Sequence, residues 1–501
     1  MKKYKEDIFC FLAFGIVILC VHLTKNLNNL DEIWIFNMAR NVANGLLPYK
    51  DFNMITTPGL PIICGAILKI FGTELLVMRI LSSFLNTGIV FLIYKILKLF
   101  NINKYLCRLI ILIIVGLFIN FFAIDYNFFI LMIALICLYI DLKNYYKTKD
   151  IFYYDKKSEI LLGILAGCSI LMKQTTGICF VIVFIGYKLL TVKTKEDFKK
   201  FFKIAVTRLS AVIVPIILLI VYLVHNNIVN DFIDYAISGI KEFSNNISYI
   251  YLLKGKVGYL AILVLIIIIS SFIIFIKRKE CTILIFLAYS MSMIIVVYPI
   301  ADTAHFLIGG IIAIITGIYI LIKFYDNKIK NKINIQDMYN STKLIKIFTG
   351  IFIMVIILGS IAKFLFYIKN CDKYTNLSNF KYIPVEKDIE QQILEVNTYI
   401  QEKKEEVYIL DASAAIYMIP LHRYNKNYDM FLIGNLGGNG SKAIVDDLKS
   451  KENIIILILK NEELMNWQTP RDVIRYIKVN YVKDGEIGIF DIYKKDKEIS
   501  S

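Results

Sequence analysis

The sequence predicts a polytopic α-helical membrane protein of about eleven transmembrane helices, followed by a small extracytoplasmic α/β domain. Two observations lead to this fold class. Hydrophobic residues make up 57% of the 501 residues and charged residues only 20%, with a mean hydropathy of +0.62, which is too apolar for a soluble protein of this size. After the last apolar stretch, the chain changes to short strand-like runs that alternate with polar helical segments.

Apolar stretches long enough to cross a bilayer recur along the first three quarters of the chain. A membrane helix needs roughly 20 such residues, so the stretch near 159–172 is short for a span. We place the spans near 8–24, 75–99, 105–122, 126–142, 159–172, 177–191, 204–224, 257–276, 281–298, 305–323 and 344–367.

Basic residues in the short loops predict the orientation, because loops rich in lysine and arginine stay in the cytoplasm. Lysines precede the first span, and four further basic clusters fall on the same side if the spans are as drawn. An N-terminus in the cytoplasm and an odd number of helices put the C-terminal domain outside. The four loop clusters lie near 143–157, 193–203, 277–279 and 323–332.

The charge is unevenly divided between the two parts of the chain. The net charge is +16, yet residues 372–501 carry 18 basic and 21 acidic side chains, a net of −3. The excess of positive charge therefore belongs to the membrane part and its contact with lipid headgroups, and nucleic acid is not expected as a partner. All nine cysteines lie at or before Cys371 without zinc-type spacing, so we expect no disulfide in the outer domain.

We predict two domains, a membrane domain over residues 1–370, with a structured first outer loop at 24–74, and an extracytoplasmic domain over 371–501. The outer domain should hold a helix within 386–406, strands near 407–410 and 453–459, a helix over 441–451, and a terminal hairpin over 481–493 that turns at Asp484-Gly485. This alternation favours a partly parallel sheet. The glycine-rich segment Gly434–Gly440 matches no dinucleotide or P-loop spacing, and we expect a flexible loop there.

An acidic pair, Asp31-Glu32, follows directly after the first span and opens the long outer loop. A carboxylate pair at the mouth of a membrane helix, followed by a large structured loop, is unusual for a simple anchor. It indicates chemistry at the outer face of the bilayer.

The first loop resembles that of the GT-C-fold glycosyltransferases, and specifically the family 39-like enzymes, which include protein O-mannosyltransferases and bacterial aminoarabinose transferases. Asp31-Glu32, Ala39-Arg40, Gly45-Leu-Leu-Pro-Tyr-Lys-Asp-Phe52 and Thr57-Pro-Gly59 carry the resemblance, and Met172-Lys-Gln-Thr-Thr-Gly177 adds to it. The double proline common in this loop is Thr57-Pro58 here, which departs from the family pattern at this turn.

That resemblance implies a polyprenyl-phosphate-linked sugar as donor and a general base just after the first helix, which corresponds to Asp31. The donor's leaving group is a phosphate, which needs cations and amide donors rather than a general acid. Asp125, beside the third span, is the second catalytic candidate, because the family also places an acid in this loop and an acid there is costly unless it has a use. Helix capping is the structural alternative for both residues.

Cationic and polar residues at the same face are candidates for holding the phosphate. Each candidate also has a structural alternative. Lys173 could snorkel to the interface, Arg40 could form an ion pair with Glu32, and His305 could have a structural role near Asp302. A turn is the alternative for Tyr49 and Asp51. His22 and His225 look structural, and His422 is expected at the surface of the C-terminal domain. The candidates for phosphate binding are Arg40, Lys173, Gln174 and His305, and further pocket candidates are Glu32, Tyr49, Asp51 and Asp302.

A metal is not assigned, although Asp31, Asp125 and His305 could in principle bind a divalent cation. Family 39-like enzymes generally need none. The expected partners are membrane lipid, a polyprenyl-phosphate sugar and an acceptor that is a lipid, glycan or protein. Abundant Ile, Lys and Asn suggest an AT-rich bacterium, which favours undecaprenyl phosphate as carrier in the cell envelope.

Two other classes of protein remain open on the sequence. A transporter or flippase of lipid-linked saccharide would have many apolar spans, but the chain contains only 8 prolines and its notable acids lie at helix mouths rather than mid-span. A structural assembly protein would explain the outer domain but not the first-loop motif.

Overall fold

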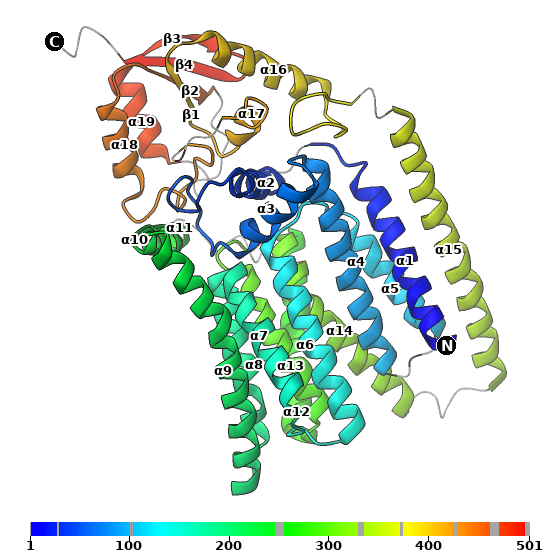
Figure 1. Ribbon diagram of the computed structural model, residues 1–501. Coiled ribbons are helices and arrows are strands. Elements are labelled where there is room, and N and C mark those ends of the chain that lie inside the picture. The colour runs from blue at the N-terminus through cyan, green and yellow to red at the C-terminus, as the bar shows by residue number, and fades with distance from the viewer. Residues whose placement is uncertain are drawn as a thin grey trace.

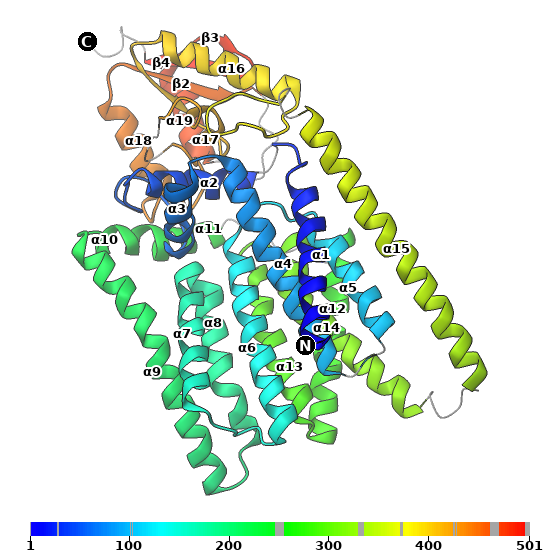
Figure 2. The same cartoon turned by 45° about the vertical axis from the view of Figure 1, so that its right-hand side comes forward.

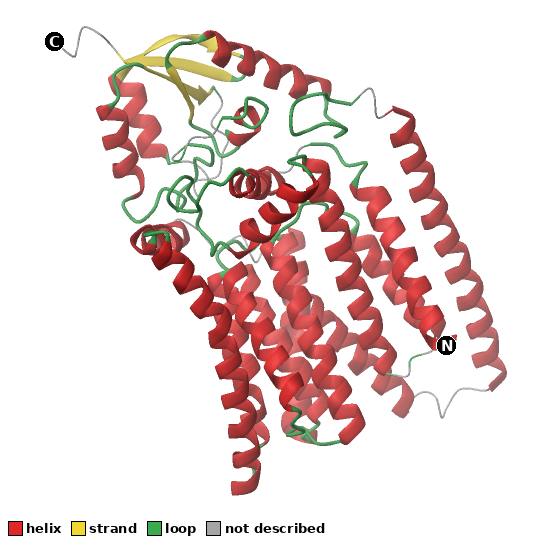
Figure 3. Cartoon of the chain, in the orientation of Figure 1, coloured by secondary structure: helices red, strands yellow, loops and turns green. Residues whose placement is uncertain are grey.

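The structure is a computed structural model in which a bundle of long helices carries a smaller mixed domain at one end (Figures 1 and 3). It describes residues 2–27, 30–100, 102, 104–245, 255–328, 335–370, 374–423, 426, 428–460 and 470–495. Part of the predicted basic cluster at 323–332 and both ends of the predicted domain at 371–501 lie outside the described residues.

The protein is a multi-pass membrane protein. Seven helices in the described residues are long and apolar enough to cross a bilayer, and each of the eleven predicted spans falls on a helix. The predicted short span is a helix of 17 residues, α7. These helices are α1 (Lys2–His22), α4 (Leu75–Leu99), α5 (Lys104–Phe118), α6 (Tyr126–Thr148), α7 (Lys156–Met172), α8 (Gln174–Gly186) with η1 (Tyr187–Thr191), α9 (Lys195–His225), α12 (Gly255–Arg278), α13 (Cys281–Met293) with η4 (Ile294–Val297), α14 (Thr303–Lys328) and α15 (Ile335–Asn370).

The bundle has a packed centre and a lipid-facing periphery. Helices α4, α6 and α14 bury more than half of their apolar segments inside the protein, whereas α12 buries 17% of its segment and α15 only 11%. Helix α15 packs chiefly on α1 and α5, and it lies at the edge of the bundle in both views (Figures 1 and 2). The apolar side chains that these peripheral helices expose suit contact with lipid tails.

The predicted first outer loop forms two helices, α2 (Leu30–Ala43) and α3 (Gly59–Phe71), which pack together across the end of the bundle, beneath the C-terminal domain (Figures 1 and 2). Between them, Tyr49 accepts a left-handed backbone with φ of 68°. The Tyr49 N–H donates to Phe52 O at 2.8 Å, and the Leu47 N–H donates to Asp51 at 2.7 Å. Tyr49 and Asp51 therefore shape the turn over residues 47–52.

A second segment at this end of the bundle follows α9. It comprises the short α10 (Val229–Phe232), a π-helical turn η2 (Ile233–Ser238) and α11 (Gly239–Asn245). It lies at the end of the bundle that carries the C-terminal domain, whereas the N-terminus and the lysine-rich start of α9 lie at the opposite end (Figure 1).

The C-terminal domain is a three-layer α/β unit with strand order β1-β2-β4-β3. Strands β1 (Glu406–Ile409) and β2 (Ile454–Leu459) are parallel, while β4 (Phe490–Lys495) is antiparallel to both β2 and β3 (Tyr481–Ile487). This confirms a partly parallel sheet. Its two faces are covered by α16 (Lys387–Glu402) with α17 (Ala415–Met418) and by α18 (Gly440–Ser450) with α19 (Arg471–Asn480).

Residues along β2 alternate between the two cores, as the strand period requires. Ile455 and Leu457 face α16 and α17, and Ile456 faces α18 and α19. The predicted position of the hairpin turn was wrong. The ladder shifts register between Lys483 and Gly485. The predicted turn residues Asp484-Gly485 therefore lie in a bulge within β3, and the chain turns at Gly488 instead.

The glycine-rich segment Gly434–Gly440 is a loop up to the start of α18, as expected, and it packs against the bundle. Its Leu436 is buried, and the Gly438 N–H donates to Asp234 Oδ1 of η2 at 2.9 Å. The segment is thus a packed contact between the C-terminal domain and the bundle. The contact can be this close because glycines have no side chains, which lets the two backbones approach each other.

Candidate active site at the end of the bundle

Four candidates from separate parts of the chain meet at the end of the bundle that carries the C-terminal domain. Asp31 lies in the first turn of α2, Asp125 caps α6, Lys173 separates α7 from α8, and His305 lies in the first turn of α14. Their charges are close enough to influence one another: Asp31 interacts with Asp125 and His305, and Asp125 interacts with His305 and Lys173.

Asp31 is a carboxylate that is both accessible and perturbed. Its side chain is exposed to solvent although protein atoms surround it. This surrounding protein raises the pKa of Asp31 to about 6; repulsion from Asp125 and Asp302 adds to the rise, while His305 opposes it. A carboxylate with a pKa near neutrality is suited to accept a proton at physiological pH.

Asp125 combines a structural contact with a place in the site. It accepts the Asn127 N–H at 2.6 Å, so it is the N-cap that the structural alternative foresaw. Burial raises the pKa of Asp125, and His305, the Asn127 N–H and Lys173 oppose that rise. The cap therefore places the Asp125 carboxyl group where it interacts electrostatically with Asp31.

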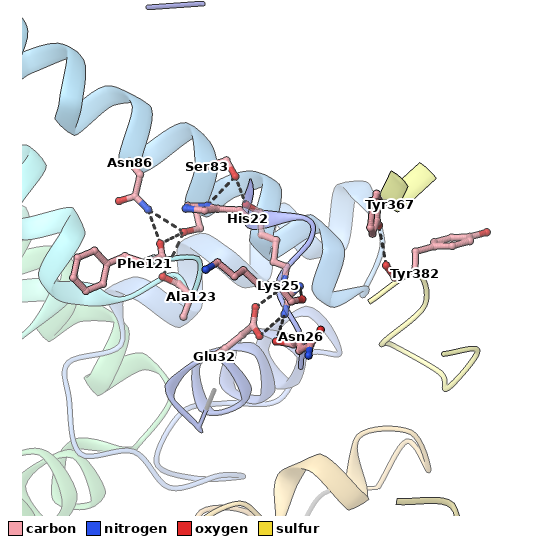
Figure 4. Close-up of polar contacts among 12 residues, drawn as sticks. His22, Lys25, Asn26, Glu32, Ser83, Asn86, Phe121, Ala123, Tyr367 and Tyr382 are labelled. Atoms are coloured by element: carbon pink, nitrogen blue, oxygen red, sulfur yellow. Dashed lines mark hydrogen bonds and ion pairs between the residues drawn. The ribbon is translucent and has the colours of Figure 1, made fainter. Parts of the chain in front are cut away.

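The loop that carries Asp125 is held by the polar face of α4 (Figure 4). Asn86 Nδ2 donates to Phe121 O at 2.7 Å, and Ser82 Oγ contacts Phe121 O and Ala123 O at 3.4 Å each. Helix α4 therefore supports the loop that places Asp125 near Asp31 of α2.

Lys173 is the buried cation of the site. Only 4% of it is exposed; its Nζ donates to Tyr298 O at 3.3 Å and lies 5.0 Å from the centre of the Tyr126 ring. Burial lowers the pKa of Lys173 to about 8, and Asp125 opposes the change. The ammonium has a carbonyl and a ring as its nearest partners, so it retains capacity for an anionic ligand.

His305 and Asp302 form a local pair at the start of α14. Asp302 Oδ1 accepts both the His305 backbone N–H, at 2.8 Å, and ring Nδ1, at 2.9 Å. Burial raises the pKa of Asp302, but the His305 contacts outweigh it and hold that pKa below its usual value. With Nδ1 held by Asp302, ring Nε2 is the nitrogen available to the site.

Three further candidates have their polar groups committed to protein partners. Glu32 forms a buried ion pair with Arg79, through Nε at 2.7 Å and Nη2 at 2.9 Å, near the start of α2 (Figure 4). Arg40 donates to the backbone oxygens of Ile419 and Arg423 at 3.0 Å each. We infer that Glu32 and Arg40 hold α2 in place, the first against α4 and the second against the C-terminal domain.

Gln174, next to Lys173, also binds backbone rather than open space. Its Nε2 donates to Ile55 O at 3.0 Å and to Ala236 O at 2.6 Å, and its Oε1 accepts the Thr57 N–H at 3.1 Å. The Thr57 hydroxyl in turn donates to Ile170 O at 2.8 Å. The Thr-Pro-Gly motif thus lies against the end of α7, beside the lysine.

Sequence reasoning missed three residues of this site. Arg79, which is fully buried, was overlooked inside an apolar span, where a lone arginine was a usable signal. Tyr126 and Tyr298 had no such signal, because the first contributes its ring and the second its backbone oxygen to Lys173.

Within the described residues, no three His, Cys, Asp or Glu side chains are arranged to share an ion. The carboxylates of Asp125 and Asp302 accept hydrogen bonds from an amide and a histidine, respectively.

No protein-family model and no curated protein matches the sequence. Solved structures do match. ArnT from Cupriavidus metallidurans in the apo state aligns with a TM-score of 0.56 at 10% identity, over 98% of both chains, and its structure bound to undecaprenyl phosphate with 0.55 at 11%, over 97% of both. The Archaeoglobus fulgidus oligosaccharyltransferase in complex with zinc and sulfate aligns with 0.51 at 11%, over 98% of this chain and 73% of that one.

This chain has a GT-C fold. The match covers the membrane bundle and the C-terminal domain together, and it confirms the GT-C fold that the resemblance implied. At 10–11% identity this likeness shows the fold alone.

Proposed function

We propose that this protein is an integral membrane glycosyltransferase that transfers a sugar from a polyprenyl-phosphate donor to an acceptor hydroxyl. The observation that carries the proposal is the presence, at one mouth of a GT-C bundle, of an accessible carboxylate, Asp31, and a buried ammonium, Lys173, each of which interacts electrostatically with Asp125. The similar ArnT structure contains undecaprenyl phosphate, which supports a lipid phosphate as the donor's leaving group.

In this reaction Asp31 is the general base. As the acceptor oxygen forms its bond to the anomeric carbon, the acceptor proton passes to the Asp31 carboxylate. A pKa of about 6 leaves Asp31 mostly ionised at pH 7 and still basic enough to take the proton. Asp125, held near Asp31, supports that basicity by repelling a second negative charge.

The departing phosphate is stabilised by cations. When the bond between the anomeric carbon and the phosphate oxygen breaks, the bonding electrons remain on the polyprenyl phosphate. Lys173 is positioned to bind this anion, and protonated His305 can donate to it through Nε2. No general acid is required, because the phosphate leaves as a stable anion.

The test is a transfer assay with purified protein in lipid nanodiscs and radiolabelled undecaprenyl-phosphate sugars. We expect transfer by the wild type and a loss of about 10²–10⁴-fold in Asp31→Asn, which keeps size but removes the base. Asp446→Asn, on the exposed surface of α18, is the matched control. Normal turnover of a folded Asp31→Asn variant would contradict the assignment and make Asp125 the leading candidate for the base.

One observation favours the alternative of a transporter or flippase, namely a buried ionic network in the bundle. Arg208 contacts Asp141 at 2.8 Å and Glu159 at 2.5 Å, and Lys188 lies 3.8 Å from Asp141. Buried charges in a membrane are often functional, but here two cations balance two anions. We infer that this network joins α6, α7 and α9. A lipid-scrambling assay on the purified protein reconstituted in vesicles separates the transporter function from the transferase function.

We further propose that the site faces away from the cytoplasm and that residues 371–501 form the extracytoplasmic domain. The lysine-rich start of α9 lies at the opposite end of the bundle from this domain, which supports the assignment (Figure 1). A reporter enzyme that is active only outside the cytoplasm should be active when fused after Lys369 and silent after Lys200. The reverse pattern would overturn the orientation.

A further inference from the structure

The glycine-rich segment Gly434–Gly440 contacts the bundle at η2 and α11 through backbone atoms. A Cβ atom added to Gly239 would lie 2.3 Å from Gly434 O, and one added to Gly437 would lie 2.3 Å from Asp234 Oδ2. Both distances are far below van der Waals contact, so side chains would separate the two surfaces. The Gly438 N–H also donates to Asp234 Oδ1 at 2.9 Å. The motif is therefore a close-fitting contact.

The other side of η2 contacts the residue next to the site lysine. Ala236 is buried, and its carbonyl accepts a hydrogen bond from Gln174 Nε2 at 2.6 Å. Such π-helical turns are rare and occur often at functional sites. A continuous path of contacts thus runs from Gly438 through Asp234 and Ala236 to Gln174.

Lys173 depends on its surroundings for its position, because among the described residues its ammonium makes no ion pair shorter than 4 Å. Its nearest partners are Tyr298 O and the Tyr126 ring. The Gly177 N–H donates to Lys173 O at 2.8 Å, so the lysine backbone is fixed at the break between α7 and α8. Gln174, the first residue of α8, is the side chain that fastens this break to other outer segments.

We propose that the C-terminal domain braces the phosphate-binding lysine: the contact of the glycine-rich segment with Asp234 holds η2, η2 holds Gln174, and Gln174 holds the break that positions Lys173. Asp234 and Gln174 are then positioning residues rather than catalytic ones. The identity of the anion as a lipid phosphate rests on the proposed function, whereas the brace itself rests on the contacts.

The experiment compares Asp234→Ala with Asp231→Ala in full-length protein in nanodiscs. Asp231 lies one turn away in α10 and makes no hydrogen bond to the C-terminal domain within the described residues, so it is the matched control. The measurement is binding of undecaprenyl phosphate. Loss of one hydrogen bond predicts about two- to tenfold weaker binding in Asp234→Ala and unchanged binding in Asp231→Ala. Equal affinities in the two variants would overturn the proposal.

A double-mutant cycle distinguishes the brace from general destabilisation. If the brace acts through Gln174, adding Asp234→Ala to Gln174→Ala should weaken binding no further, because the path is already broken. Independent, additive effects on binding would refute the path.

The outcome can also be separated from the proposed function. If the wild type fails to bind undecaprenyl phosphate, the donor assignment falls, and amide hydrogen exchange over residues 173–177 decides the brace. Faster exchange in Asp234→Ala than in Asp231→Ala supports it, and equal exchange overturns it.

Discussion

The acid limb of the pH–rate profile should report the ionisation of Asp31, and Asp125 should set its position. With a pKa of about 6, roughly one Asp31 in eleven is ionised at pH 5, so transfer at pH 5 should fall about tenfold below the plateau above pH 7. The direction follows from the role, because a general base works only when deprotonated. Activity is therefore lost as pH falls through about 6.

Asp125→Asn removes the charge that repels the ionised Asp31, while the amide oxygen can still accept the Asn127 N–H and cap α6. The limb should then move to lower pH, and the ratio of activity at pH 5 to activity at pH 7.5 should rise. The assay is initial-rate transfer at saturating donor from pH 4.5 to 9.

Asp446→Asn, which removes an exposed charge far from this cluster, should leave the limb in place. An Asp125→Asn profile that overlays that of the wild type would refute the electrostatic coupling of the two carboxylates. A limb that stays near pH 6 in an active Asp31→Asn variant would show that another group is the base.

The remaining predictions concern the phosphate cation and the support of α2. Lys173→Ala should raise the donor Kd about 10- to 150-fold with a smaller change in kcat, because a charge-assisted contact worth about 1.5–3 kcal/mol is lost; an unchanged Kd would remove the lysine from the site. In the wild type, donor affinity should weaken above pH 8, where Lys173 loses its proton. Arg79→Met should destabilise the folded protein by roughly 3–5 kcal/mol, since it removes the cation of a buried ion pair with Glu32, and the Glu32→Gln/Arg79→Met pair should recover most of that loss in thermal unfolding.

Part of the candidate site could be foreseen from its chemistry. Asp31, Asp125, Lys173 and His305 were chosen because each interrupts apolar sequence at a helix mouth on the same predicted side, and the structure brings these four together. Helix ends on one side of a bundle are confined to one narrow layer, so ionisable residues there have a good chance of meeting. Their roles stay predictions until the variants are measured.

Other candidates were chosen by the same rule and lie against protein partners. Arg40 faces carbonyls of residues more than 370 positions away, and Gln174 binds the backbone of residues 55–57 and 236. Neither contact leaves a local pattern in the sequence, because the partner is a main-chain group that every residue possesses. The same holds for the glycine-rich segment, whose partner surface is formed by η2.

The sequence by itself determined the positions of the apolar helices and the place of the mixed domain after them, and it predicts the face on which chemistry is expected. These follow from hydropathy and charge counted over short windows, because a bilayer selects on local length and polarity. Only the tertiary structure decided that Glu32 pairs with Arg79, that Arg40 fastens α2 to the C-terminal domain, and that glycines let that domain touch η2. Such contacts depend on the close packing of segments distant in the chain, where a shift of about 1 Å makes or breaks a hydrogen bond.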